Sequence, residues 1–425
     1  MVQKINLVFL TDTLGIDGPV SRETTLEYLK INSSTPTHDF FTKKINVLDK
    51  IPNEKYVVLY DTFHGLESFK SILSSNEKVR SDLKSGRCYC IFFHTDMIGM
   101  SYDKNSQFLS EFKKLCNENN ISEESFGFVF HETVLNDELD LMSHVKSDVV
   151  FFNRNAQYSW FPDGFAKTSN LDYTTLNNIF TNGHGYYRQF KYCSHNNNYK
   201  THRCELLLFL IKENILDCGV STWFGGLEPK DQGIENVDFS KFNGLSGVVD
   251  YSEEFGMDVV KTANELIPYS YDYKIHGLQD YLNVIPYFNS YFNIITESCW
   301  GPGYDKTFPQ KIHITEKVWK SIVTYQPFII ISTQNNLKKM KEWGFKTFSP
   351  WIDESYDDKE TYEERLSIIR REIIRLCGMS REELDKWYWE MSDILQYNAK
   401  HFLKFVGGEY TKLENLIIKG NSNVA

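Results

Sequence analysis

The chain lacks the features that mark several common classes of protein. It has no long hydrophobic run: the apolar stretch at residues 5–10 is too short for the core of a signal peptide, and no other stretch approaches a membrane span. It has no Cys-x-x-Cys pair among its eight cysteines, so their spacing does not indicate a metal site or a redox motif. These absences predict a cytoplasmic protein whose cysteines are reduced and mostly buried.

The chain also lacks an excess of positive charge. It has 46 Lys and Arg against 57 Asp and Glu, which gives a net charge of -11 at pH 7. Broad, non-specific binding of nucleic acid needs a large positive field and is therefore disfavoured, although a local basic site is not excluded. Hydrophobic residues make up 41% of the chain, so global disorder is excluded.

Short apolar segments alternate with helical patterns in the first part of the chain. The predicted strands are residues 5–10, 56–60, 88–94, 126–131 and 148–153, and the predicted helices are residues 66–73, 105–119 and 136–145. Apolar strands that alternate with helices predict a parallel sheet with helices on both faces.

Turn residues interrupt this alternation at residues 154–185, and a second series follows. Its predicted strands are residues 190–194, 292–296 and 328–332, and its predicted helices are residues 199–214, 316–324 and 335–343, with Gly344 as a helix stop. Ser380 and Glu383 form a capping-box pattern that opens a long helix to about Phe405.

These patterns predict two Rossmann-like α/β domains that face each other across a cleft. The predicted boundaries are 1–155 for the first domain, 156–185 for a linker, 186–379 for the second domain and 380–425 for a C-terminal helix that packs back across the domains. In open parallel sheets, ligands bind beyond the carboxyl ends of the strands. Candidate functional residues should therefore follow the predicted strands.

Two strands of the second domain are followed by a carboxylate. Glu297 comes directly after the strand at residues 292–296, and Thr315, Glu316 and Lys317 open the next helix. Such a helix start suits a nucleoside diphosphate, because its amides and Lys317 can meet phosphate oxygens while Glu316 accepts from ribose hydroxyls. The alternatives are a first-turn acid beside an exposed lysine and, for Glu297, a buried structural ion pair.

Residues 183–204 contain no Asp or Glu, although the chain as a whole is acidic. The basic and histidine residues of this stretch are His184, Arg188, Lys191, His195, Lys200, His202 and Arg203. Lys200, His202 and Arg203 open the first helix of the second domain, where Arg203 can clamp a diphosphate with two parallel hydrogen bonds. The alternative is a solvated basic helix start.

The first domain offers candidates for a general base. Asp96 follows the strand at residues 88–94 and Glu132 follows the strand at residues 126–131, each close to a histidine. Asp61 is a third, weaker candidate. A carboxylate at the end of a strand can deprotonate an acceptor hydroxyl, and the alternative for each is a capping acid beside a loop histidine.

The second half of the chain resembles the donor domain of glycosyltransferase family 10, the α1,3/4-fucosyltransferases. The resemblance is carried by Glu297-Ser298, by Ile314-Thr315-Glu316-Lys317 with Trp319, and by His202-Arg203. The chain is also similar to phage and giant-virus glycosyltransferases through Gly344-Phe345-Lys346-Thr347-Phe348 and Trp351-Ile352-Asp353-Glu354-Ser355-Tyr356-Asp357. Together these matches cover roughly residues 188–360.

The resemblance implies a GT-B glycosyltransferase that transfers a sugar from a GDP- or UDP-linked donor with inversion. It implies Arg203 and Lys317 on the diphosphate, Glu316 on the ribose and Glu297 near the sugar. No Asp-x-Asp pair occurs in the sequence, which agrees with leaving-group stabilisation by Arg and Lys and with no required metal or other cofactor. The expected acceptor is a glycan or a small molecule.

Two alternative functions are kept open. One is a phage-type DNA glycosyltransferase acting on 5-hydroxymethylated cytosine, which would have to be flipped out of the duplex. The other is a non-catalytic protein that binds a sugar or a nucleotide.

Overall fold

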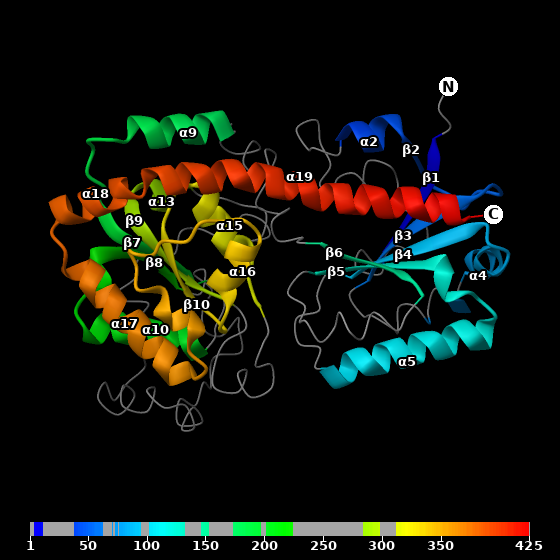
Figure 1. Ribbon diagram of the computed structural model, residues 1–425, viewed down its shortest axis with the longest axis horizontal. Helices are drawn as coiled ribbons and strands as arrows, with labels where there is room; N and C mark the ends of the chain where they lie inside the picture. The colour runs from blue at the N-terminus through cyan, green and yellow to red at the C-terminus, as the bar shows by residue number, and fades with distance from the viewer. Residues whose placement is uncertain are drawn as a thin grey trace. The chain divides into compact units, whose positions relative to one another are not determined.

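The structure is a computed structural model, and it describes residues 4–11, 38–62, 70, 73–74, 76–94, 102–131, 146–152, 173–196, 201–223, 284–297 and 312–424. Contacts divide the chain into two compact units (Figure 1). Unit 1 comprises Met1–Trp160 and Lys404–Ala425, and unit 2 comprises Phe161–Leu403.

Unit 1 contains a six-stranded sheet in the order β2-β1-β3-β4-β5-β6, in which every neighbouring pair is parallel. The strands are β1 (Ile5–Thr11), β2 (Ile45–Leu48), β3 (Tyr56–Thr62), β4 (Cys88–His94), β5 (Phe126–His131) and β6 (Asp148–Phe152). The described helices are α2 (His38–Lys43), α4 (Glu77–Lys84), α5 (Tyr102–Asn119) and the short η1 (Glu123–Ser125). The predicted parallel sheet is confirmed.

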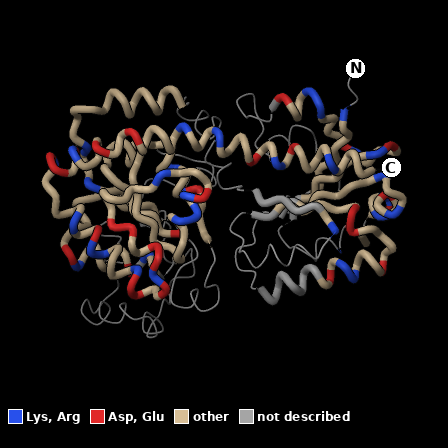
Figure 2. Tube along the Cα trace, in the orientation of Figure 1, with Lys and Arg blue, Asp and Glu red and all other residues tan. Residues whose placement is uncertain are grey.

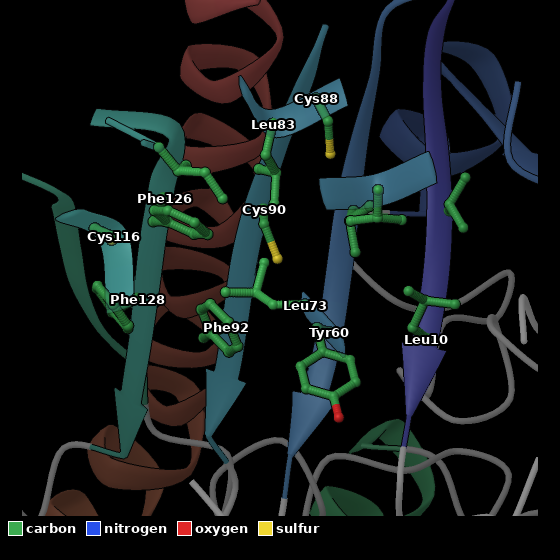
Figure 3. Close-up of a cluster of buried hydrophobic side chains, with 14 of the residues drawn as sticks. Leu10, Tyr60, Leu73, Leu83, Cys88, Cys90, Phe92, Cys116, Phe126 and Phe128 are labelled. Carbon is green, nitrogen blue, oxygen red and sulfur yellow. The ribbon is translucent and has the colours of Figure 1, made fainter. Parts of the chain in front are cut away.

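Alternating apolar residues build a core on each face of this sheet. On one face, side chains such as Tyr60 and Phe92 pack with residues of α4 and α5 (Figure 3). On the other face, Val57 and Leu59 pack with α2 and with the end of α19 (Ser392–Asn423). Both faces are apolar because parallel strands are covered on both sides.

The end of α19 packs directly on the sheet of unit 1. Leu413, Leu416 and Ile417 are buried in the core of that face. Gly420 permits this close approach, because a Cβ at that position would lie 2.3 Å from the ring of Tyr89. The prediction that the C-terminal helix ends near residue 405 is therefore wrong, since this burial outweighs the low helix propensity of the glycines at 407 and 408.

Unit 2 contains a four-stranded parallel sheet in the order β10-β9-β7-β8. The strands are β7 (Phe190–Asn196), β8 (Gly219–Trp223), β9 (Ser290–Thr296) and β10 (Phe328–Ile331). The described helices are α9 (Tyr173–Asn182), α10 (Thr201–Lys212), η2 (Leu216–Cys218), α13 (Val284–Phe288), α15 (Glu316–Val323), α16 (Asn336–Glu342), η7 (Glu354–Asp358), α17 (Tyr362–Gly378), α18 (Arg381–Glu390) and the first part of α19. Two parallel-sheet units confirm the predicted α/β class.

The strand order of unit 2 creates a topological switch point between β7 and β9. From β7 the chain moves through α10 to β8 on one side, whereas β9 lies on the other side of β7 and leads through α15 to β10. With right-handed crossovers, α10 and α15 lie on opposite faces of the sheet (Figure 1). Both helices begin at the carboxyl edge of the two central strands, which is where open α/β sheets bind ligands.

Some elements differ from the prediction. Helix α9 lies inside the stretch predicted as a linker, and α18 and α19 form separate helices around Met391 where one helix was predicted. The capping box of Ser380 and Glu383 is present as predicted. Gly344 adopts a left-handed φ of +88° after α16, which confirms the predicted helix stop. The helices predicted at residues 66–73 and 136–145 lie largely outside the described residues.

None of the described helices combines the length and the apolar character needed to cross a membrane. In Figure 2, acidic and basic residues are interspersed along helices such as α17 and α19, whereas α9 has neither.

Candidate functional site

Glu297 follows β9 at the switch point and is fully buried. Its Oε1 accepts a hydrogen bond of 2.8 Å from the Thr315 backbone N–H, and its Oε2 accepts one of 2.6 Å from the Thr315 hydroxyl. Lys317 Nζ donates to the same Oε2 at 3.2 Å. Glu297 therefore joins the end of β9 to the start of α15, and a buried carboxylate with these partners has its charge compensated.

Lys317 has three oxygen partners around its ammonium group. Besides Glu297, Nζ lies 2.9 Å from Thr315 Oγ1 and 3.4 Å from Glu316 Oε1. The Lys317 side chain is 20% exposed, whereas the Glu297 side chain is not exposed at all. The lysine is thus anchored from the protein interior while part of its surface faces outward.

The opposite charges of Lys317 and Glu316 stabilise each other. Burial opposes the charge on Lys317, but Glu297 and Glu316 outweigh this effect and raise its pKa above the ordinary value. Burial likewise opposes the charge on Glu316, but Lys317, Lys320 and its own backbone N–H lower its pKa to about 2. Lys317 and Glu316 are therefore both charged at neutral pH.

Thr315 precedes α15 but does not cap it with its side chain. A threonine at this position commonly accepts from an amide of the first turn. Here its hydroxyl instead donates to Glu297. The sequence therefore uses the usual capping residue to fix the buried carboxylate, and the first turn of α15 begins beside Lys317 and Glu316.

The start of α10 reaches the end of the same strand from the other face of the sheet. His202 Nε2 lies 2.8 Å from the Glu297 carbonyl oxygen, and an Arg203 terminal nitrogen donates to the Thr296 carbonyl oxygen at 3.4 Å. Both side chains are only 3% exposed. Arg203 is also close enough to Lys317 to act electrostatically against its charge. Two cations from two helices are thus brought to one place.

A chain of buried hydrogen bonds ties the two central strands together beneath this cluster. The Thr296 hydroxyl donates to Asn196 Oδ1 at 2.6 Å, and the Asn196 amide donates to Ser194 Oγ at 3.1 Å. Asn196 and Thr296 are not among the predicted site residues. The signal that could have found them is the polar end of two otherwise apolar strands, since a buried polar side chain needs a partner.

The acid-free stretch at residues 183–204 divides into two parts with different contacts. At the amino end of β7, Arg188 donates to three backbone carbonyls, and Lys191 donates to the carbonyls of Cys377 and Met379. The His195 ring stacks on the Tyr287 ring at 5.1 Å, and burial followed by the charge of Lys320 lowers its pKa to about 4. Of the described members of the stretch, His202 and Arg203 lie at the switch point.

The segments that resemble phage and giant-virus enzymes form hydrogen bonds within unit 2. Glu354 accepts from the Thr347 hydroxyl at 2.7 Å and from the Phe348 N–H at 2.5 Å. Asp357 accepts from two first-turn amides of α16, those of Leu337 and Lys338, at 3.1 and 3.0 Å. Both carboxylates form hydrogen bonds within their own unit. These contacts give Glu354 and Asp357 a structural role.

Three of the predicted site residues, Asp96, Glu132 and Lys200, lie outside the described residues, and their roles stay predictions. Asp61 is the last but one residue of β3, where its backbone pairs in register with Thr11 of β1. The order β2-β1-β3 makes this pair the switch point of the first sheet. Within the described ranges, no group of three or more His, Cys, Asp and Glu residues is arranged to hold a metal ion.

No protein-family model and no curated protein matches the chain. Two solved structures align with most of it. The α,α-trehalose 6-phosphate synthase of Burkholderia multivorans aligns with a TM-score of 0.40 and 10% identity, covering 93% of this chain and 77% of that one. The N-terminal domain of Candida albicans trehalose-6-phosphate phosphatase aligns with a TM-score of 0.39 and 8% identity, covering 85% of this chain and 71% of that one. Because both TM-scores are low, the fold assignment rests on strand order and register.

Proposed function

We propose that the protein is a glycosyltransferase that uses a nucleoside-diphosphate sugar, with the donor diphosphate bound at the switch point of unit 2. The observation that carries the proposal is the convergence of Lys317 and Arg203, which arrive from two helices at the carboxyl end of β9. Both cations are suited to phosphate oxygens, and because Lys317 is already paired with Glu297 and Glu316, a bound diphosphate would compete with these carboxylates for its ammonium group.

The neighbouring residues suit the rest of a nucleotide. Glu316 is charged, 18% exposed and placed at the first turn of α15, where a carboxylate can accept from ribose hydroxyls. Glu297 has three protein donors and no exposed surface, and this geometry favours a positioning role over the contact with the sugar that the resemblance implies. His202 and Thr315 hold the same strand end and helix start in place.

The proposed chemistry is an inverting transfer without a required metal. Lys317 and Arg203 would stabilise the charge that develops on the departing diphosphate, in a site where burial strengthens electrostatic interactions. A carboxylate of unit 1 would deprotonate the acceptor hydroxyl. The candidates are Asp96, Glu132 and Asp61, of which Asp61 is supported by its register position at the first switch point.

The expected result for Lys317→Met is a loss of affinity for GDP or UDP of about 10- to 100-fold, which corresponds to one charged hydrogen bond to phosphate. The measurement is isothermal titration calorimetry with both nucleotides. Lys338→Met is the matched control, because Lys338 is an exposed lysine on α16 and its loss should leave affinity unchanged. Equal affinity of the wild type and Lys317→Met would remove Lys317 from the site.

Catalysis and binding can be separated with the wild-type protein. A glycosyltransferase of this kind should hydrolyse its donor sugar slowly when no acceptor is present, whereas a non-catalytic binding protein should not.

The net charge of -11 gives no support to a modified-DNA acceptor, and a glycan or small-molecule acceptor is proposed instead.

A further inference from the structure

The three partners of Lys317 differ in their surroundings. Glu297 and Thr315 lie on the interior side, where the Thr315 side chain and the Glu297 carboxylate also bond to each other at 2.6 Å. Glu316 lies on the outer side, and its distance of 3.4 Å from Nζ is the longest of the three. An ammonium group has three N–H donors, so all three directions around Nζ are used.

An incoming phosphate must therefore replace one of these partners. Displacing Glu297 would leave a fully buried carboxylate with one charge partner fewer, and displacing Thr315 would disturb the same buried pair. Displacing Glu316 breaks the longest contact and moves a side chain that already reaches the surface. The geometry selects Glu316 as the partner that leaves.

From this we infer that the Glu316 carboxylate occupies the anion position on Lys317 in the free protein, and that a nucleoside diphosphate exchanges with it. The phosphate takes over Lys317, and the released carboxylate accepts hydrogen bonds from the ribose hydroxyls. This inference rests on the proposed function, because it assigns diphosphate and ribose to the same site. It makes Glu316 a specificity residue that couples recognition of the two groups.

The exchange would let the site discriminate between anions. Inorganic pyrophosphate must break the Glu316–Lys317 ion pair without gaining the ribose hydrogen bonds. A nucleoside diphosphate breaks the same pair but recovers the carboxylate as an acceptor. Glu316 therefore opposes the binding of a bare anion and favours a nucleotide.

The test compares Glu316→Gln with the wild type by calorimetry, using three ligands: inorganic pyrophosphate, UDP or GDP (whichever binds the wild type more tightly), and the 2′,3′-dideoxy form of that nucleotide. Glu316→Gln should bind pyrophosphate and the dideoxy nucleotide about tenfold more tightly, because the competing charge on Lys317 is gone. The natural nucleotide should lack this gain, because the charged acceptor of its ribose hydroxyls is lost together with the competing charge. A thermal melt of the variant confirms that it is folded.

Other outcomes overturn the inference in distinguishable ways. An equal gain for all three ligands would mean that Glu316 acts only through its charge at a distance. Unchanged pyrophosphate affinity together with weaker nucleotide binding would mean that Glu316 contacts ribose without blocking Lys317. If the wild type binds none of the three, the proposed function fails together with the inference.

Discussion

Glu297→Gln is expected to lower the free energy of unfolding by about 3–5 kcal/mol, the range for breaking a buried ion pair by removing one partner. The amide keeps the size of the side chain but places an NH₂ group among the donors of Thr315 and Lys317. One of the two oxygens remains as an acceptor, so the Thr315 N–H, the Thr315 hydroxyl and the half-buried Lys317 ammonium compete for a single oxygen. Urea denaturation followed by circular dichroism measures the change.

The matched control for this substitution is Glu342→Gln. Glu342 pairs with Lys339 at 3.1 Å, but its side chain is 52% exposed, and an exposed pair contributes about 0.2–1 kcal/mol. A loss for Glu297→Gln as small as that of the control would mean that Glu297 does not join β9 to α15 as described.

Arg188→Met has the second large expected effect, a loss of about 1.5–3 kcal/mol of stability, the range for hydrogen bonds to a charged group, with no change in nucleotide affinity. One terminal nitrogen of Arg188 donates to the carbonyls of Tyr287, Phe288 and Ser290 at 2.9–3.1 Å, and the guanidinium lies 4.1 Å from the centre of the Tyr388 ring. Methionine fills the space of the aliphatic stem but removes one donor from each of these carbonyls, of which those of Tyr287 and Ser290 keep the Gln326 side-chain amide as a second donor. Chemical denaturation measures the stability, and calorimetry with GDP and UDP measures the affinity.

Arg371→Met is the control, because its side chain is 69% exposed and pairs with Asp353 at 3.7 Å. Arg188 and Arg203 both lie in the acid-free stretch, but only Arg203 is assigned to the nucleotide site. The substitution therefore tests whether Arg188 has a structural role alone. If Arg188→Met weakened nucleotide binding while the protein stayed folded, the assignment of Arg188 to the structural end of the strand would be wrong.

The sequence predicts the strands of unit 1 well, because each is a short, strongly apolar run bounded by polar residues. The predicted bounds of β4 and β5 agree with the structure at both ends. The strand β2 has only four residues and β8 begins at a glycine, so neither pattern stands out from its surroundings. Both become strands because they pair with a neighbour that the sequence does not reveal.

Helix α17 is not among the predicted helices, although its start has a capping pattern in the sequence. Thr361 caps it by accepting from the Glu364 N–H at 3.3 Å, and the Thr-x-x-Glu spacing is the same signature that correctly predicts the start of α18. Residues at its 3.6 period, such as Leu366, Ile369 and Ile373, are buried. Local sequence was sufficient for this element.

The candidate site was predictable in its members but not in their contacts. Glu297, Thr315 and Lys317 could be placed at strand and helix ends from local patterns, and the structure brings them together. That Glu297 turns inward to the lysine, and that Arg188 differs from Arg203, depends on which strand is adjacent to which. The difference between Arg188 and Arg203 arises from the β7–β9 pairing across about a hundred residues of sequence, whereas the Glu297–Lys317 contact joins β9 to the helix that follows it in the same unit.

The proposed function requires that the switch point between β7 and β9 bind the diphosphate of a nucleotide. A crystal structure of the protein soaked with GDP or UDP tests this requirement. We expect phosphate oxygens within hydrogen-bond distance of Lys317 Nζ and the Arg203 guanidinium, with the ribose hydroxyls on Glu316. A nucleotide bound away from the carboxyl ends of β7 and β9, with the Glu316–Lys317 pair intact, would contradict it.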